Sequence, residues 1–315
     1  MRPETVSGAL GRYGGRLADA GVPQARLDAR LLMQHGLGVS HEELLASPGR
    51  QLSKTELDRL ERLIERRAAR EPVSRIAGER EFYGRAFAVT PDTLDPRPDT
   101  ETLVETALEI ARQRLHHVAA PRLADLGTGS GAVAVSLIGE LKQWTGIATD
   151  VSAAALDAAK ANALRHKVTD RLAFVRTTWL DSVPGVFDLI VANPPYIPSA
   201  EIDGLAPEVA AFEPRVALDG GTDGLSAYRD LAARIGKSLD SGGFLCLEIG
   251  EGQTDDVRKI MAAGGFGPAG ESLHVRRDLA GVARVLTFTV SATACTEAAE
   301  ISWKLDGNRL GSGTG

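Results

Sequence analysis

Cysteine, excess positive charge and long apolar runs are all scarce in this chain. Its 315 residues include two cysteines, Cys246 and Cys295, which are too few for a disulfide framework or a zinc cage. No apolar run approaches the ~18 residues of a membrane-spanning helix, and the first residues lack the continuous apolar stretch of a signal peptide. We therefore expect a protein of the reducing cytoplasm that binds no membrane and no metal, with Cys246 as an inert core thiol.

The charge balance is acidic. Lysine and arginine number 36 against 42 acidic residues, which gives a net charge of −6 and a pI of about 5.6. This balance argues against stable binding to nucleic acid, which needs a basic surface. Apolar residues make up 43% of the chain, enough for a sizeable core, and a prior of ~150 residues per domain predicts two domains.

Residues 1–70 contain helical patterns only. Two serine–glutamate pairs, at 40 and 43 and at 53 and 56, have the spacing of capping boxes ahead of apolar runs. The last of these predicted helices carries five arginines: Arg59, Arg62, Arg66, Arg67 and Arg70. Two interpretations remain open, either a solvated face balanced by nearby glutamates or a surface that contacts a large acidic partner.

Residues 71–98 change in character and predict a β-hairpin that links two domains. Residues 82–84 and 87–89 flank a short turn, and three prolines follow them. Asp99 is placed to cap the helix that begins the second domain, residues 99–290. Residues 291–315 have no convincing period, and we expect them to form a disordered tail.

From residue 121 onward, strand and helix patterns alternate. Short apolar runs predict five strands and a final edge strand, at 123–126, 147–150, 172–175, 188–193, 244–249 and 285–290. This alternation is typical of a parallel, doubly wound α/β sheet. In such sheets ligands bind at the carboxyl ends of the strands, so loops that follow the predicted strands are candidate sites.

A glycine-rich loop, Asp-Leu-Gly-Thr-Gly-Ser-Gly at 125–131, follows one strand and opens a helix. Its glycines allow a tight turn and a close approach of a ligand, and the free N–H groups of the helix favour an anionic group. Asp150 lies 23 positions after Gly127, at the end of the next strand, where a carboxylate can accept from both ribose hydroxyls. The loop alone suits a pyrophosphate or the aminocarboxylate of S-adenosylmethionine. Asp125 would repel the first and attract an ammonium, so the sequence favours the methyl donor.

A second motif, Asn193-Pro194-Pro195-Tyr196, ends the strand at 188–193 abruptly, because proline cannot donate to a ladder. A planar nitrogen is a poor nucleophile, so it accepts a methyl group only when it is held in line and its N–H groups find acceptors. The carbonyls of Asn193 and Pro194 can be those acceptors, and Tyr196 offers a stacking face. Placement of this kind contributes ~7–11 kcal/mol, with electrostatic complementarity besides. The candidate catalytic residues are Asn193, Pro194 and Tyr196, and the candidate substrate-binding residues are Asn193, Pro194, Pro195 and Tyr196.

Together the two motifs resemble S-adenosylmethionine-dependent methyltransferases of planar amino groups, and the flanking residues resemble the HemK/PrmC family of peptide chain release factor glutamine N5-methyltransferases. The flanking matches are Glu71-Pro72-Val73, Gly78-Glu79, Glu81-Phe82-Tyr83-Gly84, Pro96-Arg97-Pro98-Asp99-Thr100-Glu101, Glu213-Pro214, Ala217-Leu218-Asp219-Gly220-Gly221 and Asp223-Gly224-Leu225. The resemblance covers roughly residues 5–290.

The resemblance implies a Rossmann-like, seven-stranded methyltransferase domain preceded by a small all-α bundle that recognises the substrate. It implies an enzyme that methylates the glutamine of the Gly-Gly-Gln motif of class 1 release factors and yields S-adenosylhomocysteine. We also expect the protein to be a monomer. The cofactor-binding residues that it implies are Asp125, Gly127, Thr128, Gly129, Gly131, Asp150, Thr178, Trp179 and Asn193, with Trp179 over the adenine. The family usually has an acidic residue where this chain has Thr178, so Thr178, Asp181 or backbone could hold the adenine amine.

Four alternatives stay open beside this interpretation. A sibling enzyme would methylate a glutamine of a ribosomal protein, and another would methylate the exocyclic amine of adenine in nucleic acid. The second must flip a base and grip phosphates, which the acidic net charge disfavours. A non-enzymatic cofactor-binding protein would not need the intact Asn-Pro-Pro-Tyr motif. A nicotinamide dehydrogenase would give that motif no role.

Overall fold

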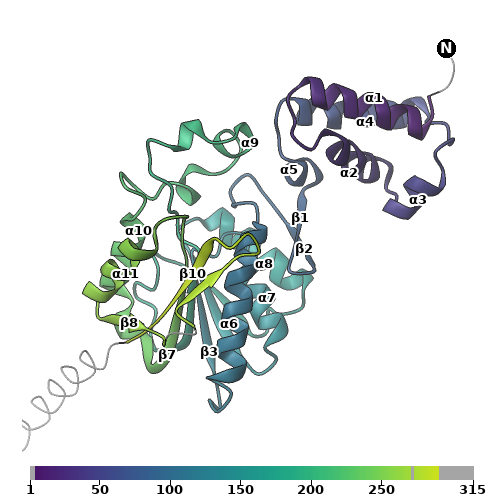
Figure 1. Ribbon diagram of the computed structural model, residues 1–315. Helices are drawn as coiled ribbons and strands as arrows, with labels where there is room; N and C mark the ends of the chain where they lie inside the picture. Colours follow the sequence, from purple (N-terminus) through teal and green to yellow (C-terminus); the bar gives the residue numbers. More distant parts are fainter. Residues whose placement is uncertain (1–3, 271–272, 291–315) are drawn as a thin grey trace, which may run out of the picture.

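The structure is a computed structural model that describes residues 4–270 and 273–290. A small helical bundle at the amino-terminal end stands beside a larger α/β body, and a two-stranded hairpin lies between them (Figure 1). The predicted tail, residues 291–315, and Cys295 within it lie outside the described residues.

The bundle is built from four helices and a short fifth one. Their bounds are α1 Val6–Asp19, α2 Ala25–Leu37, α3 His41–Ala46, α4 Lys54–Ala68 and α5 Val73–Ala77. Both predicted capping boxes are confirmed, at the starts of α3 and α4. The bundle has its own apolar core, in which Tyr13, Leu17, Leu32, Leu60 and Ile64 are fully buried. Burial of these faces, more than helix propensity, holds such short helices together.

The linker contains the predicted hairpin and also a helix that the sequence analysis missed. Strands β1 (Glu79–Phe82) and β2 (Arg85–Ala88) pair antiparallel. Residues 73–77, expected to be linker without a helix, form α5, which ends at Gly78 in the left-handed conformation. Phe82 and Phe87 are buried in the core of the larger body and meet edge to face at 6.1 Å. The hairpin is therefore packed as part of that body.

The larger body contains one mixed sheet in the order β5-β4-β3-β6-β7-β10-β8, with β9 also paired to β10. The strands are β3 Arg122–Leu126, β4 Thr145–Asp150, β5 Leu172–Arg176, β6 Phe187–Ala192, β7 Leu239–Glu248, β8 Phe266–Pro268, β9 Val275–Arg277 and β10 Ala283–Val290. Strands β5, β4, β3, β6 and β7 are parallel, as predicted.

The predicted sheet was wrong in the place and the direction of its last strand. Strand β10 was expected at an edge of a parallel sheet, but it runs antiparallel to β7 and is covered on its other side by β8 and β9. These two short strands occupy consecutive stretches of β10, so they share the seventh position of the expected seven-stranded sheet. Neither strand exceeds three residues, which is too short for the apolar alternation that marks longer strands.

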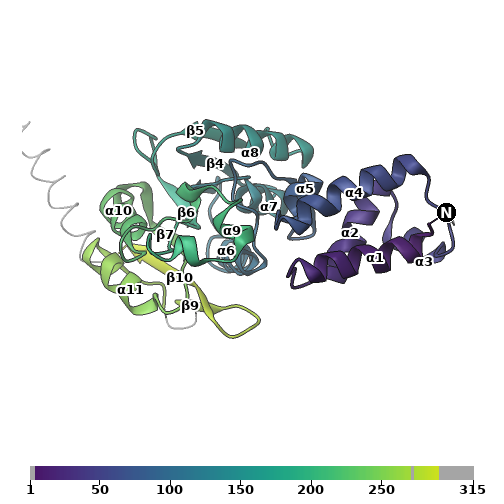
Figure 2. The ribbon, with the colours of Figure 1, turned by 90° about the horizontal axis from the view of Figure 1, so that it is seen from above.

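Helices cover both faces of the sheet (Figure 2). Their bounds are α6 Glu101–Gln113, α7 Ala132–Glu140, α8 Ala153–Arg165, α10 Ser226–Arg234 and α11 Thr254–Ala263, with the short α9 Pro207–Ala210 outside the layers. One apolar core lies under α6 and α7 and the other under α10 and α11. Asp99 was expected to cap α6, but it lies in a 3₁₀ turn before that helix and pairs with Arg284 at 3.0 Å. Within residues 4–270 and 273–290, no helix is both long and apolar enough to cross a membrane.

Four of the five arginines bond other groups of the described chain, and two of these, Arg67 and Arg70, reach α9. Arg67 is buried and bonds Asp28 at 2.8 Å and Glu208, in α9, at 2.9 Å. Arg70 bonds both oxygens of Glu208, at 2.8 and 2.7 Å. The bundle is thus tied by charge to the segment that follows β6. For these two arginines neither earlier interpretation is right, since their partner is an acidic residue of the same molecule.

A second charged cluster ties the same segment to the linker. The Glu213 carboxylate, whose side chain is 1% exposed, accepts from Arg75 at 2.7 Å and from Arg97 at 3.1 Å. It also accepts from the backbone N–H of Asp95 at 3.1 Å. A buried carboxylate with three donors is held firmly in place, because each donor replaces the water that burial removed.

Candidate active site

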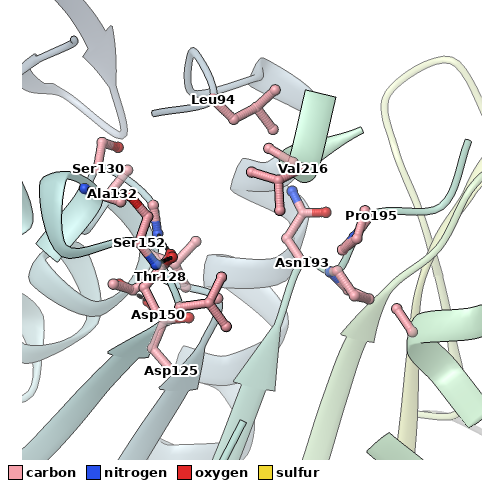
Figure 3. Close-up of a pocket in the computed structure, with 18 of the residues that line it drawn as sticks. Leu94, Asp125, Thr128, Ser130, Ala132, Asp150, Ser152, Asn193, Pro195 and Val216 are labelled. Atoms are coloured by element: carbon pink, nitrogen blue, oxygen red, sulfur yellow. Dashed lines mark hydrogen bonds between the residues drawn. The ribbon is translucent and has the colours of Figure 1, made fainter. Parts of the chain in front are cut away.

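A cavity of about 510 Å³ opens at the carboxyl ends of β3, β4 and β6. The chain leaves β3 toward β4 and β5 and then crosses to β6 on the other side of β3, so the cavity lies where the strand order reverses. The ends of these strands and the loops that follow them line the cavity. Figure 3 shows Asp125, Thr128 and Asp150 on one side and Asn193 and Pro195 on the other.

The glycine-rich loop lies along the first wall. Gly127 and Gly129 have φ of 70° and 56°, a region that other residues enter only with strain. Thr128 donates its backbone N–H to Thr149 of β4 at 2.9 Å, which fixes the loop to the sheet. Gly131 does not line the cavity. A Cβ there would lie 3.0 Å from the Cβ of Ala159, so this glycine allows α7 to begin close against α8.

Asp125 is buried at the base of the loop. Its Oδ2 accepts from the Thr128 hydroxyl at 2.6 Å and from the Ala134 backbone N–H at 3.2 Å, while the residue lines the cavity. Burial raises the pKa of Asp125 to about 6, although these two hydrogen bonds lower it. A carboxylate deprived of water in this way gains most from a cationic ligand group, since the dielectric around it is low.

Asp150 is the last residue of β4 and joins two loops. Its Oδ2 accepts from the Gly129 backbone N–H and its Oδ1 from that of Ser152, each at 2.9 Å. Each carboxylate oxygen keeps a further lone pair. Asp150 also lines the cavity, so those lone pairs are placed for a ligand with neighbouring hydroxyls.

The far end of the cavity holds Thr178 and Trp179. Trp179 has φ of 51° and donates its indole N–H to Asp230 of α10 at 2.7 Å. Thr178 and Asp230 line the cavity as well. Asp181, the other side chain considered for an adenine amine, bonds Arg234 at 2.8 Å and is not among the lining residues. Asp230 is an acidic residue that lines this end of the cavity. It was not predicted from the sequence, because it lies in a helix and pairs with Arg234 as a surface residue would.

Asn193, Pro194 and Pro195 line the opposite wall. Asn193 follows β6, and its Nδ2 donates to the Thr100 hydroxyl at 3.2 Å. Tyr196, expected to stack on a substrate, is not a lining residue. Its ring packs against the core under α10 and α11, its carbonyl accepts from Gln253 at 3.0 Å, and burial raises its pKa to about 12.

The rim of the cavity is formed by residues that were not among the predicted site residues. The linker contributes Phe82, Leu94, Pro96 and Arg97, and the segment after β6 contributes Val216, Ala217 and Asp219. Leu94 and Val216 lie above Asn193 in Figure 3. Val216 lies at the mouth of the cavity and is 62% exposed, which is unusual for a large apolar residue. The rim is therefore mostly apolar, with Arg97 and Asp219 as its charged members.

Another missed residue lies behind Asn193. Glu248 ends β7 and is 1% exposed, and the Thr100 and Asn193 side chains are beside its carboxyl group. Burial raises the pKa of Glu248 to about 7. The available signal was a single acidic residue within an apolar strand, Phe-Leu-Cys-Leu-Glu-Ile. Lone carboxylates in such strands are rarely kept without a partner or a role.

Comparison with known proteins agrees with this architecture. Residues 9–78 match the family described as PrmC N-terminal domain, and residues 101–209 match the methyltransferase small domain. The release factor glutamine methyltransferase of Bradyrhizobium diazoefficiens is 42% identical over 288 residues, covering 90% of this chain and 94% of that protein. That of Rhodospirillum rubrum is 44% identical over 277 residues, covering 88% and 82%. Among solved structures, the hMettl16 catalytic domain in complex with a 3'UTR hairpin matches with TM-score 0.52 and 15% identity, over 76% of this chain and 84% of that one, which shows a shared fold.

Proposed function

This chain belongs to the release factor glutamine methyltransferase family, and from that premise we propose that it transfers a methyl group from S-adenosylmethionine to the glutamine N5 of the Gly-Gly-Gln motif in class 1 release factors. The observation that carries the proposal is the meeting of the glycine-rich loop and Asn193-Pro194-Pro195 across one cavity. Relatives with the same activity are similar over most of their length, so both motifs come within the shared region.

The residues of the first wall fit the cofactor. Asp125 offers a buried carboxylate for the ammonium, Gly127 and Gly129 keep the loop free of Cβ atoms, and Asp150 has lone pairs for the ribose. Trp179, held by Asp230, offers a flat surface for the adenine. When bound, S-adenosylmethionine supplies an electrophilic methyl group on a cationic sulfur.

The residues of the second wall fit a glutamine amide. The Asn193 side-chain carbonyl and the Pro194 backbone carbonyl accept its two N–H groups, which draws the nitrogen lone pair out of conjugation and toward the methyl group. The amide nitrogen would take the methyl group as its bond to sulfur breaks, with S-adenosylhomocysteine as the leaving group, and the nitrogen would then release one proton to solvent. Two glycines beside the target allow a thin strand of backbone to pass the rim at Leu94 and Val216.

The direct test is methyl acceptance by purified proteins. The full chain, incubated with labelled S-adenosylmethionine and its own class 1 release factor, is expected to label the Gly-Gly-Gln glutamine, and a release factor with alanine at that position is the matched control. Equal labelling of that control would place the methyl group elsewhere. Labelling of a ribosomal protein or of DNA, with none on release factor, would replace this proposal with one of the two sibling activities. Cytoplasmic location and the monomeric state stay predictions.

A further inference from the structure

Glu248, the last residue of the strand next to β6, has a side-chain carboxyl group to which the proposed chemistry gives no role. In the parallel pair of β6 and β7, Ala192 lies opposite Leu247. The same register places the next residues, Asn193 and Glu248, side by side at the carboxyl edge of the sheet. Glu248 belongs to an otherwise apolar strand, and its backbone carbonyl accepts from the Tyr228 hydroxyl at 2.9 Å, which holds the strand end in place.

The Glu248 carboxyl group is enclosed and incompletely satisfied. The residue is 1% exposed, and its Oε2 has no hydrogen-bond partner within the part of the chain that the structure describes. The side chains beside the carboxyl group are those of Thr100 and Asn193, and Asn193 donates its Nδ2 hydrogen to Thr100 at 3.2 Å. A buried polar atom without a partner is unfavourable, so this carboxyl group calls for a function.

Glu248 and Thr100 present oxygen atoms to one end of the Asn193 amide. An ionised carboxylate only accepts hydrogen bonds, so the amide end that faces it is the NH₂ end, and the carbonyl oxygen is turned the other way. We propose that Glu248 is a positioning residue which, through Thr100, fixes the Asn193 amide so that its Oδ1 faces the cavity as an acceptor. This deepens the proposed function and rests on it, because a flipped amide would present a donor to the N–H groups of the substrate glutamine.

Protonated Glu248 would no longer hold the Asn193 amide in one orientation. A protonated carboxyl group has an O–H that can donate to Asn193 Oδ1, which allows the flipped amide. Burial raises the pKa of Glu248 to about 7, and the charged or titratable groups around it are Arg284 of β10, which lowers the pKa, and Asp99 of the 3₁₀ turn, which raises it. Tyr196 and Tyr228 also face this region, but both hydroxyls are neutral at such pH because burial raises the pKa of each.

The experiment compares variants of the full-length enzyme, with whole release factor as the methyl acceptor and S-adenosylhomocysteine binding measured separately. We expect Glu248→Ala and Thr100→Val each to lower kcat at least tenfold while the Kd for S-adenosylhomocysteine stays within threefold. Thr100→Ser keeps the hydroxyl and is expected to restore kcat to within threefold of the parent enzyme. Glu248→Gln cannot titrate, so the fall in kcat that we expect for the parent enzyme below pH ~7 is lost in this variant.

Thr287→Val is the matched structural control. Thr287 is a fully buried polar residue of β10, its hydroxyl contacts Cys246 of β7, and neither residue lines the cavity. Its kcat is expected within twofold of the parent enzyme. A Thr100→Val enzyme with kcat also within twofold, or an unchanged acidic limb in Glu248→Gln, would overturn the positioning role. If the parent enzyme fails to label release factor, the proposed function itself fails, and that result is read from the parent enzyme alone.

Discussion

Asp125 makes cofactor binding dependent on pH, and the size of the effect follows from its burial. The pKa of Asp125 is raised from 3.8 to about 6, chiefly because burial penalises the charged form. Because the pKa is higher in the folded enzyme than in the unfolded chain, protonated Asp125 contributes to the free energy of unfolding. In the free enzyme this contribution is complete below pH ~4 and is lost as the pH rises through about 6. The ammonium of a bound cofactor favours the ionised form and offsets this loss. Binding therefore releases a proton wherever free Asp125 is protonated.

The expected magnitude is a decline in affinity of about tenfold between pH 7 and pH 5. This value applies if the bound ammonium returns the pKa of Asp125 to its ordinary range near 4. Asp125→Asn removes the charge and with it a charge-assisted hydrogen bond of about 1.5–3 kcal/mol. At pH ~8 the variant is then expected to bind roughly 10- to 150-fold more weakly, with no further loss on acidification.

Calorimetric titration with S-adenosylhomocysteine from pH ~5 to pH ~8 measures this dependence directly. Methylthioadenosine is the matched control ligand, because it keeps the adenosine but lacks the aminocarboxylate that would reach Asp125. Its affinity is expected to stay level over the same range. An equal decline for methylthioadenosine, or the same decline in Asp125→Asn, would refute the assignment of the acidic limb to Asp125.

Two further perturbations test the second wall and its support. Asn193→Ala is expected to lower kcat by ~10²–10³, the usual loss for one transition-state hydrogen bond, with little change in the Kd for S-adenosylhomocysteine; an equal loss of binding would make Asn193 mainly a cofactor residue. Glu213→Gln leaves the buried Arg75 without its charge partner, and is expected to lower the free energy of unfolding in urea by ~3–5 kcal/mol. The same change at Glu208, whose side chain is 18% exposed, is the control and should cost ~1 kcal/mol; equal costs at both positions would contradict the burial argument.

The site was predictable from sequence where the chemistry follows a strand directly. Residues after β3, β4 and β6 meet in the cavity because parallel strands end at one edge, and that rule needs only the strand pattern. The predicted roles of these residues remain proposals. Gly131 and Tyr196 do not line the cavity, since a motif does not say whether a side chain turns toward the ligand or toward the neighbouring helix and core.

The remaining features depend on contacts between distant segments. The antiparallel course of β10 is set by pairing with β7, and an apolar run has the same appearance in either direction. Asp230 resembled a surface residue because its helical neighbour Arg234 could pair with it, whereas its second contact is Trp179. Glu248 lies beside Asn193 only because β7 pairs with β6 in this register. Such contacts join residues tens of positions apart and leave no local pattern.

The contacts of Glu208 and Glu213 limit how this molecule could be recombined with its relatives. Glu208 joins the segment after β6 to Arg67 and Arg70 of the bundle, and Glu213 joins it to Arg75 of the linker. A chimera cut at the apparent boundary near residue 70 would exchange Arg67 and Arg70 but keep Arg75 and both glutamates. The bundle and the segment from 198 to 219 would therefore have to be exchanged together to keep these ion pairs, although a long stretch of sheet and helix separates them in the sequence.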